Sequence, residues 1–189
     1  EGCLPDVTND NFLLWAFNKP PIQGWVLRQF AEIPGMLTTE RVKECYEPLC
    51  RWTEWWFRCR DYDGDGVVQC NHGNDGGWDN ATVFDLGLPV ESPDLTAFLV
   101  IQCEMLAEMA RWLGLPTSTV ETWAQRGAQS LERLLLHSRR GDQFVAPRSG
   151  DHAVPEGSDS LLNYIPIILG MRLPEDLRTA IVLRELEGL

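Results

Sequence analysis

Apolar residues recur every three or four positions along most of the chain, which is the spacing of amphipathic α-helices. The pattern predicts a first helix that opens at Pro20–Pro21 and stops at Pro34–Gly35. A second helix is predicted to begin after a cap at Thr38 or Thr39. Its apolar stripe comprises Val42, Cys45, Tyr46, Leu49, Trp52 and Trp56. Each of these two predicted helices has one apolar face, which must pack against another element of the fold.

The next two predicted helices have clear start signals. Ser92–Asp94 combines a cap with a first-turn proline, and the apolar face that follows ends at Gly114. Ser118 and Glu121 fit a capping box, after which a fourth helix runs toward His137. We therefore expect an all-α protein built from helical hairpins.

The C-terminal part predicts a fifth helix that starts near Ser160 and breaks around Pro166 and Gly170, and a sixth that begins at 174–176. Helical hairpins of this kind form solenoids, bundles or arcs of an (α/α) toroid, and the pattern alone does not choose among them. The long polar, glycine-rich stretches are 61–81 and 140–160. Function carried by loops is expected there.

The composition of the chain restricts the kinds of molecule that it can bind. The chain has 189 residues, 44% of them hydrophobic, which suits a single domain spanning 1–189. Its net charge of −12 disfavours nucleic acid, because gripping phosphates requires positive charge. No stretch approaches a membrane span of about 20 apolar residues, so we expect a soluble chain and no membrane partner. The compartment stays open, with a slight preference for the cytoplasm.

Cysteines and histidines give no sign of a zinc site in the sequence. The six cysteines are too sparse for a disulfide scaffold and have no pair at zinc-knuckle spacing, and three of them suit buried helical faces. His137 and His152 have no cysteine or histidine companion at ligand spacing, so no zinc role is predicted for them.

The stretch from Asp61 resembles the first half of a calcium-binding EF-hand loop. Asp61, Asp63, Asp65 and Gly66 have the required spacing, but His72 stands where the bidentate Glu belongs. Two interpretations stay open. The three aspartates bind a structural Ca²⁺ that a distant carboxylate completes, or they form turns. No other cofactor is required.

Gly76–Asn80 is the sharper chemical signal. A carboxylate such as Asp79, next to an indole and between flexible glycines, can be desolvated until it holds a proton near neutral pH, as a general acid must. Trp78 can stack on a sugar ring. The same residues also suit an Asp turn with a half-buried tryptophan.

A family resemblance adds to this interpretation. The chain resembles the (α/α)6-barrel glycosidases of glycoside hydrolase family 63 and the related trehalases and mannosylglycerate hydrolases. The resemblance covers most of the chain, and the motifs that carry it are Lys19–Trp25, Asp63–Gly66, His72–Thr82, Glu91–Leu95 and 161–166.

The resemblance implies an inverting hydrolase of α-linked glucosides or related sugars. It places the general acid on Asp79, with Trp78 and Asn80 lining a sugar subsite and an oligosaccharide or small glycoside as substrate. The family's base is a later Glu that no acidic residue here matches, and the six predicted helices are half of the twelve in a closed toroid. We therefore expect about half of a catalytic barrel, completed by further sequence or by a second chain. One alternative is a non-catalytic carbohydrate-binding or assembly module that keeps the acid loop, by which we mean the motif His72–Thr82, and lacks the base. Another is a Ca²⁺-stabilised helical scaffold with no ligand.

Four more residues are candidates for substrate contact. His72 lies in the acid loop, and Lys19 stands just before the first helix. Trp15 and Phe17 precede that helix without sharing its periodic face, in a region that walls the pocket in the family. The aromatic group at 52–57 instead predicts core packing, because part of it lies on the apolar stripe of the second helix.

Overall fold

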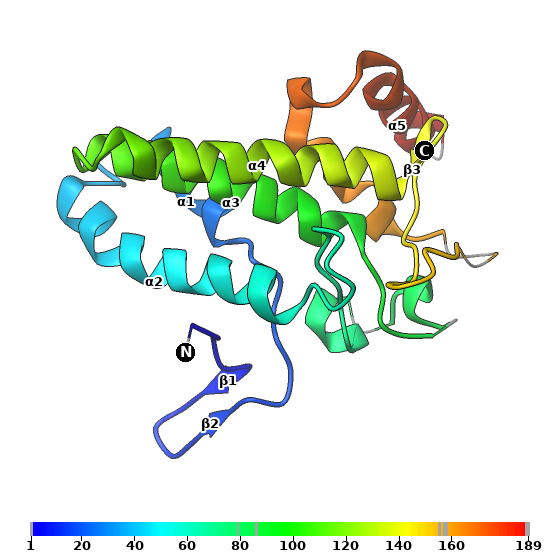
Figure 1. Ribbon diagram of the computed structural model, residues 1–189, viewed down its shortest axis with the longest axis horizontal. Coiled ribbons are helices and arrows are strands. Elements are labelled where there is room, and N and C mark those ends of the chain that lie inside the picture. Colours follow the sequence, from blue (N-terminus) through cyan, green and yellow to red (C-terminus); the bar gives the residue numbers. More distant parts are fainter. Residues whose placement is uncertain (1, 79, 86, 155, 157–158, 188–189) are drawn as a thin grey trace.

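The computed structural model describes residues 2–78, 80–85, 87–154, 156 and 159–187, and it is mostly helical, as predicted (Figure 1). The α-helices are α1 (Gln23–Ala31), α2 (Thr39–Cys59), α3 (Pro93–Trp112), α4 (Thr117–Ser138) and α5 (Glu175–Glu187). The 3-10 helices are η1 (Gly73–Gly76), η2 (Thr82–Phe84), η3 (Leu161–Asn163) and η4 (Ile165–Arg172). Two short antiparallel pairs join β1 (Val7–Thr8) to β2 (Leu13–Leu14) and β3 (Arg139–Arg140) to β4 (Gln143–Phe144).

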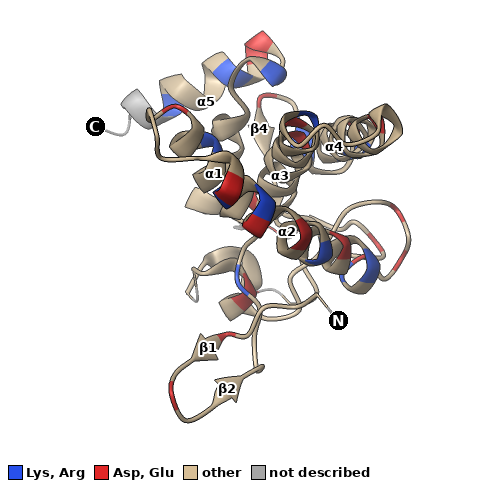
Figure 2. Cartoon of the chain, turned by 90° about the vertical axis from the view of Figure 1, so that its left-hand side faces the viewer, with Lys and Arg blue, Asp and Glu red and all other residues tan. Residues whose placement is uncertain are grey.

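The centre of the fold is α3. This helix is apolar on nearly all sides and is buried along most of its length, with α1, α2, α4 and η4 packed around it (Figure 2). α1 and α3 approach closely at Gly24, where a Cβ atom would lie 2.4 Å from the Cα of Gln102. The Gln102 side chain accepts a hydrogen bond from the backbone N–H of Gly24 and donates one to Thr53 Oγ1. One buried amide therefore joins α1, α2 and α3.

The predicted starts of α2, α3 and α5 are confirmed, whereas α1 begins only at Gln23, with Ile22 as its N-cap, after the predicted opening at Pro20–Pro21. Thr38 caps α2 by accepting from the backbone N–H of Arg41, and Pro93 is the first residue of α3. The predicted capping box at Ser118 is wrong, because α4 begins at Thr117 and its N-cap is Pro116, which places Ser118 inside the first turn.

The segment predicted as a broken fifth helix is 3-10 rather than α-helical. It consists of η3 and η4, and Gly170 adopts φ 57°, a left-handed conformation that interrupts regular geometry. Leu169, just before the interruption, is fully buried in the core beside α3. Packing of the apolar segment thus holds it in place without a continuous α-helix.

The tryptophans of α2 confirm the core expectation in part. Trp52 and Trp56 are fully buried and pack with Val68 and Cys70 of the following loop. Trp55 is half-buried beneath the guanidinium of Arg60. The core of the helical layer therefore extends under the loops that follow α2.

The N-terminal hairpin β1–β2 projects from the helical body (Figure 2). Its apolar residues are exposed: Leu4, Val7, Phe12, Leu13, Leu14 and Trp15.

The two polar stretches meet on one side of the molecule, where the loops gather (Figure 1). Val90 forms isolated β-bridges with Cys70 and with Arg148, so segments far apart in sequence lie side by side. Ser149 Oγ also donates to Gln69 Oε1 at 2.6 Å. The candidate functional residues are thus brought to a common face.

Candidate active site

A buried carboxylate anchors the predicted acid loop. Asp75 is only 2% exposed, and its Oδ1 accepts from the backbone N–H of Asn18 at 2.9 Å. Its Oδ2 accepts from the backbone N–H groups of Asn71 and His72 at 2.9 and 3.1 Å. Hydrogen bonds to a charged acceptor are the stronger kind, so Asp75 holds the segment before α1 against the acid loop. Sequence reasoning missed this role, which depends on contacts with residues far away.

The glycines of the loop allow close packing and a reversal of the chain. Gly77 has φ +70°, the left-handed region in which an L side chain is strained, and it lies against Pro20. A Cβ at Gly76 would meet the ring of Phe84 at 3.1 Å. These positions direct the chain outward just before Trp78.

Trp78 is exposed to 47% and borders two adjoining hollows. One hollow, of about 450 Å³, is apolar and lies against η3, η4 and α5, with Leu161 and Ile168 in its wall. The other, of about 420 Å³, contains Asn80 and Ser160. The structure therefore places Trp78 and Asn80 at one opening, while Asp79 lies outside the described residues.

The other predicted contact residues are divided between two places. His72 is exposed, and its ring packs on Phe17 with the centroids 4.5 Å apart, so these two lie at the acid loop. Lys19 forms a 3.0 Å ion pair with Asp6. Trp15 is 56% exposed on the projecting hairpin. Their roles toward substrate remain predictions.

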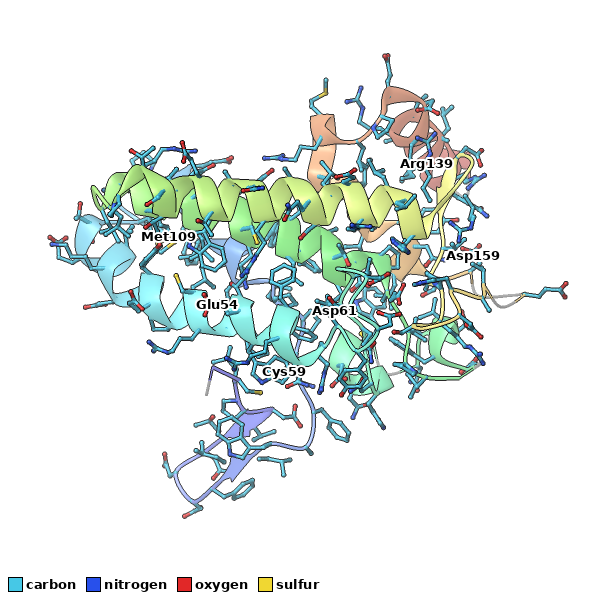
Figure 3. The ribbon with its side chains drawn as sticks, viewed as in Figure 1. Glu54, Cys59, Asp61, Met109, Arg139 and Asp159 are labelled. Atoms are coloured by element: carbon cyan, nitrogen blue, oxygen red, sulfur yellow. The ribbon has the colours of Figure 1, made fainter. Side chains whose placement is uncertain are left out.

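The three predicted calcium ligands follow α2, where Figure 3 labels Asp61 just beyond Cys59. Asp61 accepts backbone hydrogen bonds from Gly64 and Gly66, and burial raises the pKa of its carboxyl above the usual value. Asp63 accepts from the backbone N–H of Gly150 at 2.8 Å. The contacts of Asp61 are those of a tight turn, whereas the contact of Asp63 joins this loop to the 140–160 stretch. Oxygens of Asp61, Asp63 and Asp65 also lie within 4.8 Å of one another, and Ca²⁺ binding there stays a prediction.

A second group shares Asp65, and we call it the carboxylate–histidine cluster: Asp65, Glu91, His137 and His152. Asp65 Oδ2 lies 3.2 Å from His137 Nδ1 and 3.7 Å from His152 Nε2. The other ring nitrogen of His152 lies 3.2 Å from Glu91 Oε2. Burial, together with the charge of Asp65, raises the pKa of Glu91 to about 7. No pattern along the chain signals this cluster, because its members come from four separate segments.

Solved structures show that the chain has an all-α toroid fold. It superposes with a TM-score of 0.78 on the family 63 mannosylglycerate hydrolase of Thermus thermophilus in complex with Tris, at 15% identity, covering 99% of this chain and 62% of that one. The same hydrolase in complex with glucose gives a TM-score of 0.73 at 18% identity, covering 90% and 51%. An uncharacterized conserved protein from that organism gives 0.77 at 17% identity, covering 99% and 59%. The predicted fold, part of an (α/α) toroid, is confirmed.

The family follows from the sequence match. A model described as the mannosylglycerate hydrolase MGH1-like glycoside hydrolase domain matches residues 8–187, and the chain belongs to that family. The predicted resemblance is thereby confirmed. No curated protein matches the chain. This chain spans between 51% and 62% of the length of the three T. thermophilus chains above. Among the described helices, none has the length and apolar character of a membrane span.

Proposed function

We propose that this chain carries the general-acid side of an inverting glycoside hydrolase acting on α-linked glucosides or related sugars, with Asp79 as the acid. The observation that supports this most is the architecture around it. Asp75 anchors the acid loop to the segment before α1, and Trp78 and Asn80 flank Asp79 in sequence at an opening bordered by two hollows. A fixed loop beside an open aromatic face suits the positioning of a sugar.

In the proposed reaction, Asp79 protonates the glycosidic oxygen while a second carboxylate activates water on the opposite face of the sugar. Inverting enzymes separate these two carboxyl groups by roughly 6.5–9.5 Å to leave room for the water. Trp78 stacks on the sugar ring and Asn80 binds a hydroxyl. The base comes from the further part of the barrel, in a longer polypeptide or in a second chain.

A small glycoside is the substrate class that the relatives support. The T. thermophilus hydrolase has been solved with glucose, and with Tris and D-glycerate. Mannosylglycerate, α-glucosides and α-mannosides therefore form the substrate panel.

Hydrolysis of this panel, with the product anomers followed by NMR, tests the proposal. Once the longer polypeptide or the second chain that supplies the base completes the barrel, we expect release of the inverted anomer and a loss of about 10²–10⁴-fold in turnover for Asp79→Asn, the usual size of a general-acid contribution. Asp85→Asn is the matched control, since Asp85 is an exposed carboxylate of the same segment. Sugar binding by Asp79→Asn should stay near that of the unmodified chain.

Two results would contradict the proposal. Unchanged turnover in Asp79→Asn would remove Asp79 from the mechanism. Sugar binding by calorimetry without hydrolysis of any substrate, in the oligomer and in the completed barrel, would favour the alternative of a non-catalytic carbohydrate-binding module.

A further inference from the structure

We propose that Thr82 is a positioning residue for the general acid, because its hydroxyl fastens the end of the acid loop to the segment before η3. The inference rests on the role proposed for Asp79. It concerns how the loop that carries this residue is held at both of its ends. Asp75 fixes the start of the loop through three backbone donors. The contacts that fix its end involve η2 and the residues just before η3.

The hydroxyl of Thr82 makes a hydrogen bond to a distant part of the chain. Thr82 Oγ1 donates to the backbone carbonyl of Asp159 at 2.6 Å, a short distance for a bond between two oxygens. Figure 3 shows Asp159 on the side where the loops gather. The residue after the acceptor, Ser160, caps η3, because its Oγ accepts from the backbone N–H of Leu162 at 3.3 Å. The acceptor therefore lies directly before a capped 3-10 helix.

The core holds the residues that follow Thr82. Val83 is 1% exposed and shares a buried cluster with Leu162. The ring of Phe84 lies against the loop itself, since a Cβ at Gly76 would meet its Cζ at 3.1 Å. Close packing of this kind fixes the backbone of η2 against the rest of the fold. Thr82, the first residue of η2, is exposed and is held by its hydroxyl instead.

The span before Thr82 is short. The backbone N–H of Ala81 donates to the carbonyl of Trp78 at 2.9 Å, which closes a turn directly before Thr82. In sequence, Asp79 and Asn80 fall within this span. A shift of Thr82 is therefore passed to the proposed acid through very few bonds. At a catalytic group, a displacement of about 1 Å can cost about 10² in rate.

The same hydrogen bond joins the two segments that line the polar hollow. This hollow of about 420 Å³ is lined by Trp78 and Asn80 from the acid loop, and by Asp159 and Ser160 from the segment before η3. Thr82 lines it as well, and its hydroxyl connects the two segments. An exposed hydrogen bond between neutral groups adds little to global stability. Its effect is to fix the acid loop relative to the segment that it faces.

Thr82→Val tests the proposal, because valine keeps the shape of threonine and lacks the hydroxyl. In the completed barrel, with an unactivated glycoside, kcat should fall by about 10- to 100-fold while KM stays within about twofold. Thr82→Ser keeps the hydroxyl and should recover most of the loss. Thr122→Val is the matched control, since the exposed Thr122 donates to the backbone carbonyl of Ser118 within α4 and lies outside the acid loop.

The leaving group separates positioning of the acid from a merely structural role. A nitrophenolate leaves with little help from a general acid, so nitrophenyl α-glycosides should lose much less turnover in Thr82→Val than unactivated glycosides do. Asp79→Asn should show the same dependence on the leaving group. A general loosening of the site would lower turnover of both substrates by the same factor.

Hydrogen exchange on the chain itself supplies a measurement that is independent of turnover. The amide of Ala81, which is bonded to Trp78, should exchange about tenfold faster in Thr82→Val. The amide of Asn71, which is bonded to Asp75, should exchange at an unchanged rate. Thermal unfolding should shift by less than about 2 °C, because the lost hydrogen bond is exposed.

Three results would overturn the inference while the proposed function stands. They are full turnover in Thr82→Val when Asp79→Asn is impaired, an equal loss on activated and unactivated substrates, and unchanged exchange at Ala81. Unchanged turnover in Asp79→Asn, or no hydrolysis by the completed barrel, would remove the proposed function itself and the role of Thr82 with it.

Discussion

The acid loop and the carboxylate–histidine cluster both lie where the loops converge, but their buried carboxylates differ in how completely they are hydrogen-bonded. The acid loop hides one carboxylate, Asp75, beneath three backbone N–H donors and leaves Trp78 open to solvent. The cluster buries Glu91 with an oxygen that no described donor reaches. The buried Asp75 is satisfied by three backbone donors, whereas Glu91 has one oxygen 3.2 Å from His152 Nδ1 and the other without a described partner, so its burial is less well compensated.

The largest expected effect separates a buried tryptophan from an exposed one. Trp56→Ala should lower the free energy of unfolding by about 3–5 kcal/mol, because it empties the core beneath the loops. Trp78→Ala should change stability by less than about 0.5 kcal/mol while weakening sugar binding about tenfold. Urea denaturation and calorimetry measure both. A large stability loss in Trp78→Ala would show that this side chain is part of the core.

Removal of the anchor of the acid loop should have the next largest effect. Asp75→Ala leaves three backbone donors without their acceptor and should cost about 3 kcal/mol of unfolding free energy. Turnover should fall as well, because the loop loses its fixed position. Asp75→Asn keeps one carbonyl oxygen and should lose less in urea denaturation. Equal losses in the two variants would argue against the hydrogen bonds as the cause.

A third buried carboxylate extends the comparison to pH. Burial raises the pKa of Asp94 to about 6, despite its hydrogen bond from Ser92 Oγ. Since the unfolded value is about 3.9, the folded state holds its proton more tightly, and stability should fall as pH rises from about 4 to 6, by on the order of 2 kcal/mol. Asp94→Asn should lack this part of the fall in denaturation curves at several pH values. Parallel pH profiles for the two proteins would contradict the burial effect.

The smallest effect concerns the turn before Trp78. Gly77→Ala should cost about 1 kcal/mol, since an alanine there must adopt a positive φ. Gly141→Ala is the matched control, with φ +63° in the open β3–β4 turn. Both should lose similar stability in thermal unfolding, and Gly77→Ala should in addition weaken sugar binding. Equal sugar affinity in both would separate the turn from the binding site.

Helix positions could be predicted because their signals are local. Pro93 and Thr38 act within one turn of the chain, so the sequence reveals them directly. Gly170 signalled a break, but the 3-10 form of η4 depends on packing against α3. The sequence did not predict that His137 and His152 lie together with Asp65 and Glu91, because spacing along the chain says nothing about residues that meet through the fold. The anchoring role of Asp75 could not be predicted for the same reason, since it depends on the backbone N–H of the distant Asn18.

The bridges of Val90 with Cys70 and Arg148 carry a consequence for the order in which the molecule assembles. Each pairing closes a long loop and therefore has a high entropic cost until the helices on either side have docked. The side of the molecule where Val90 pairs with Cys70 and Arg148, which we call the loop face, should consequently form last on folding. Under native conditions it should open first, ahead of α3. In hydrogen exchange, the amide of Val90 would report on the integrity of this face, and those of α3 on the whole chain.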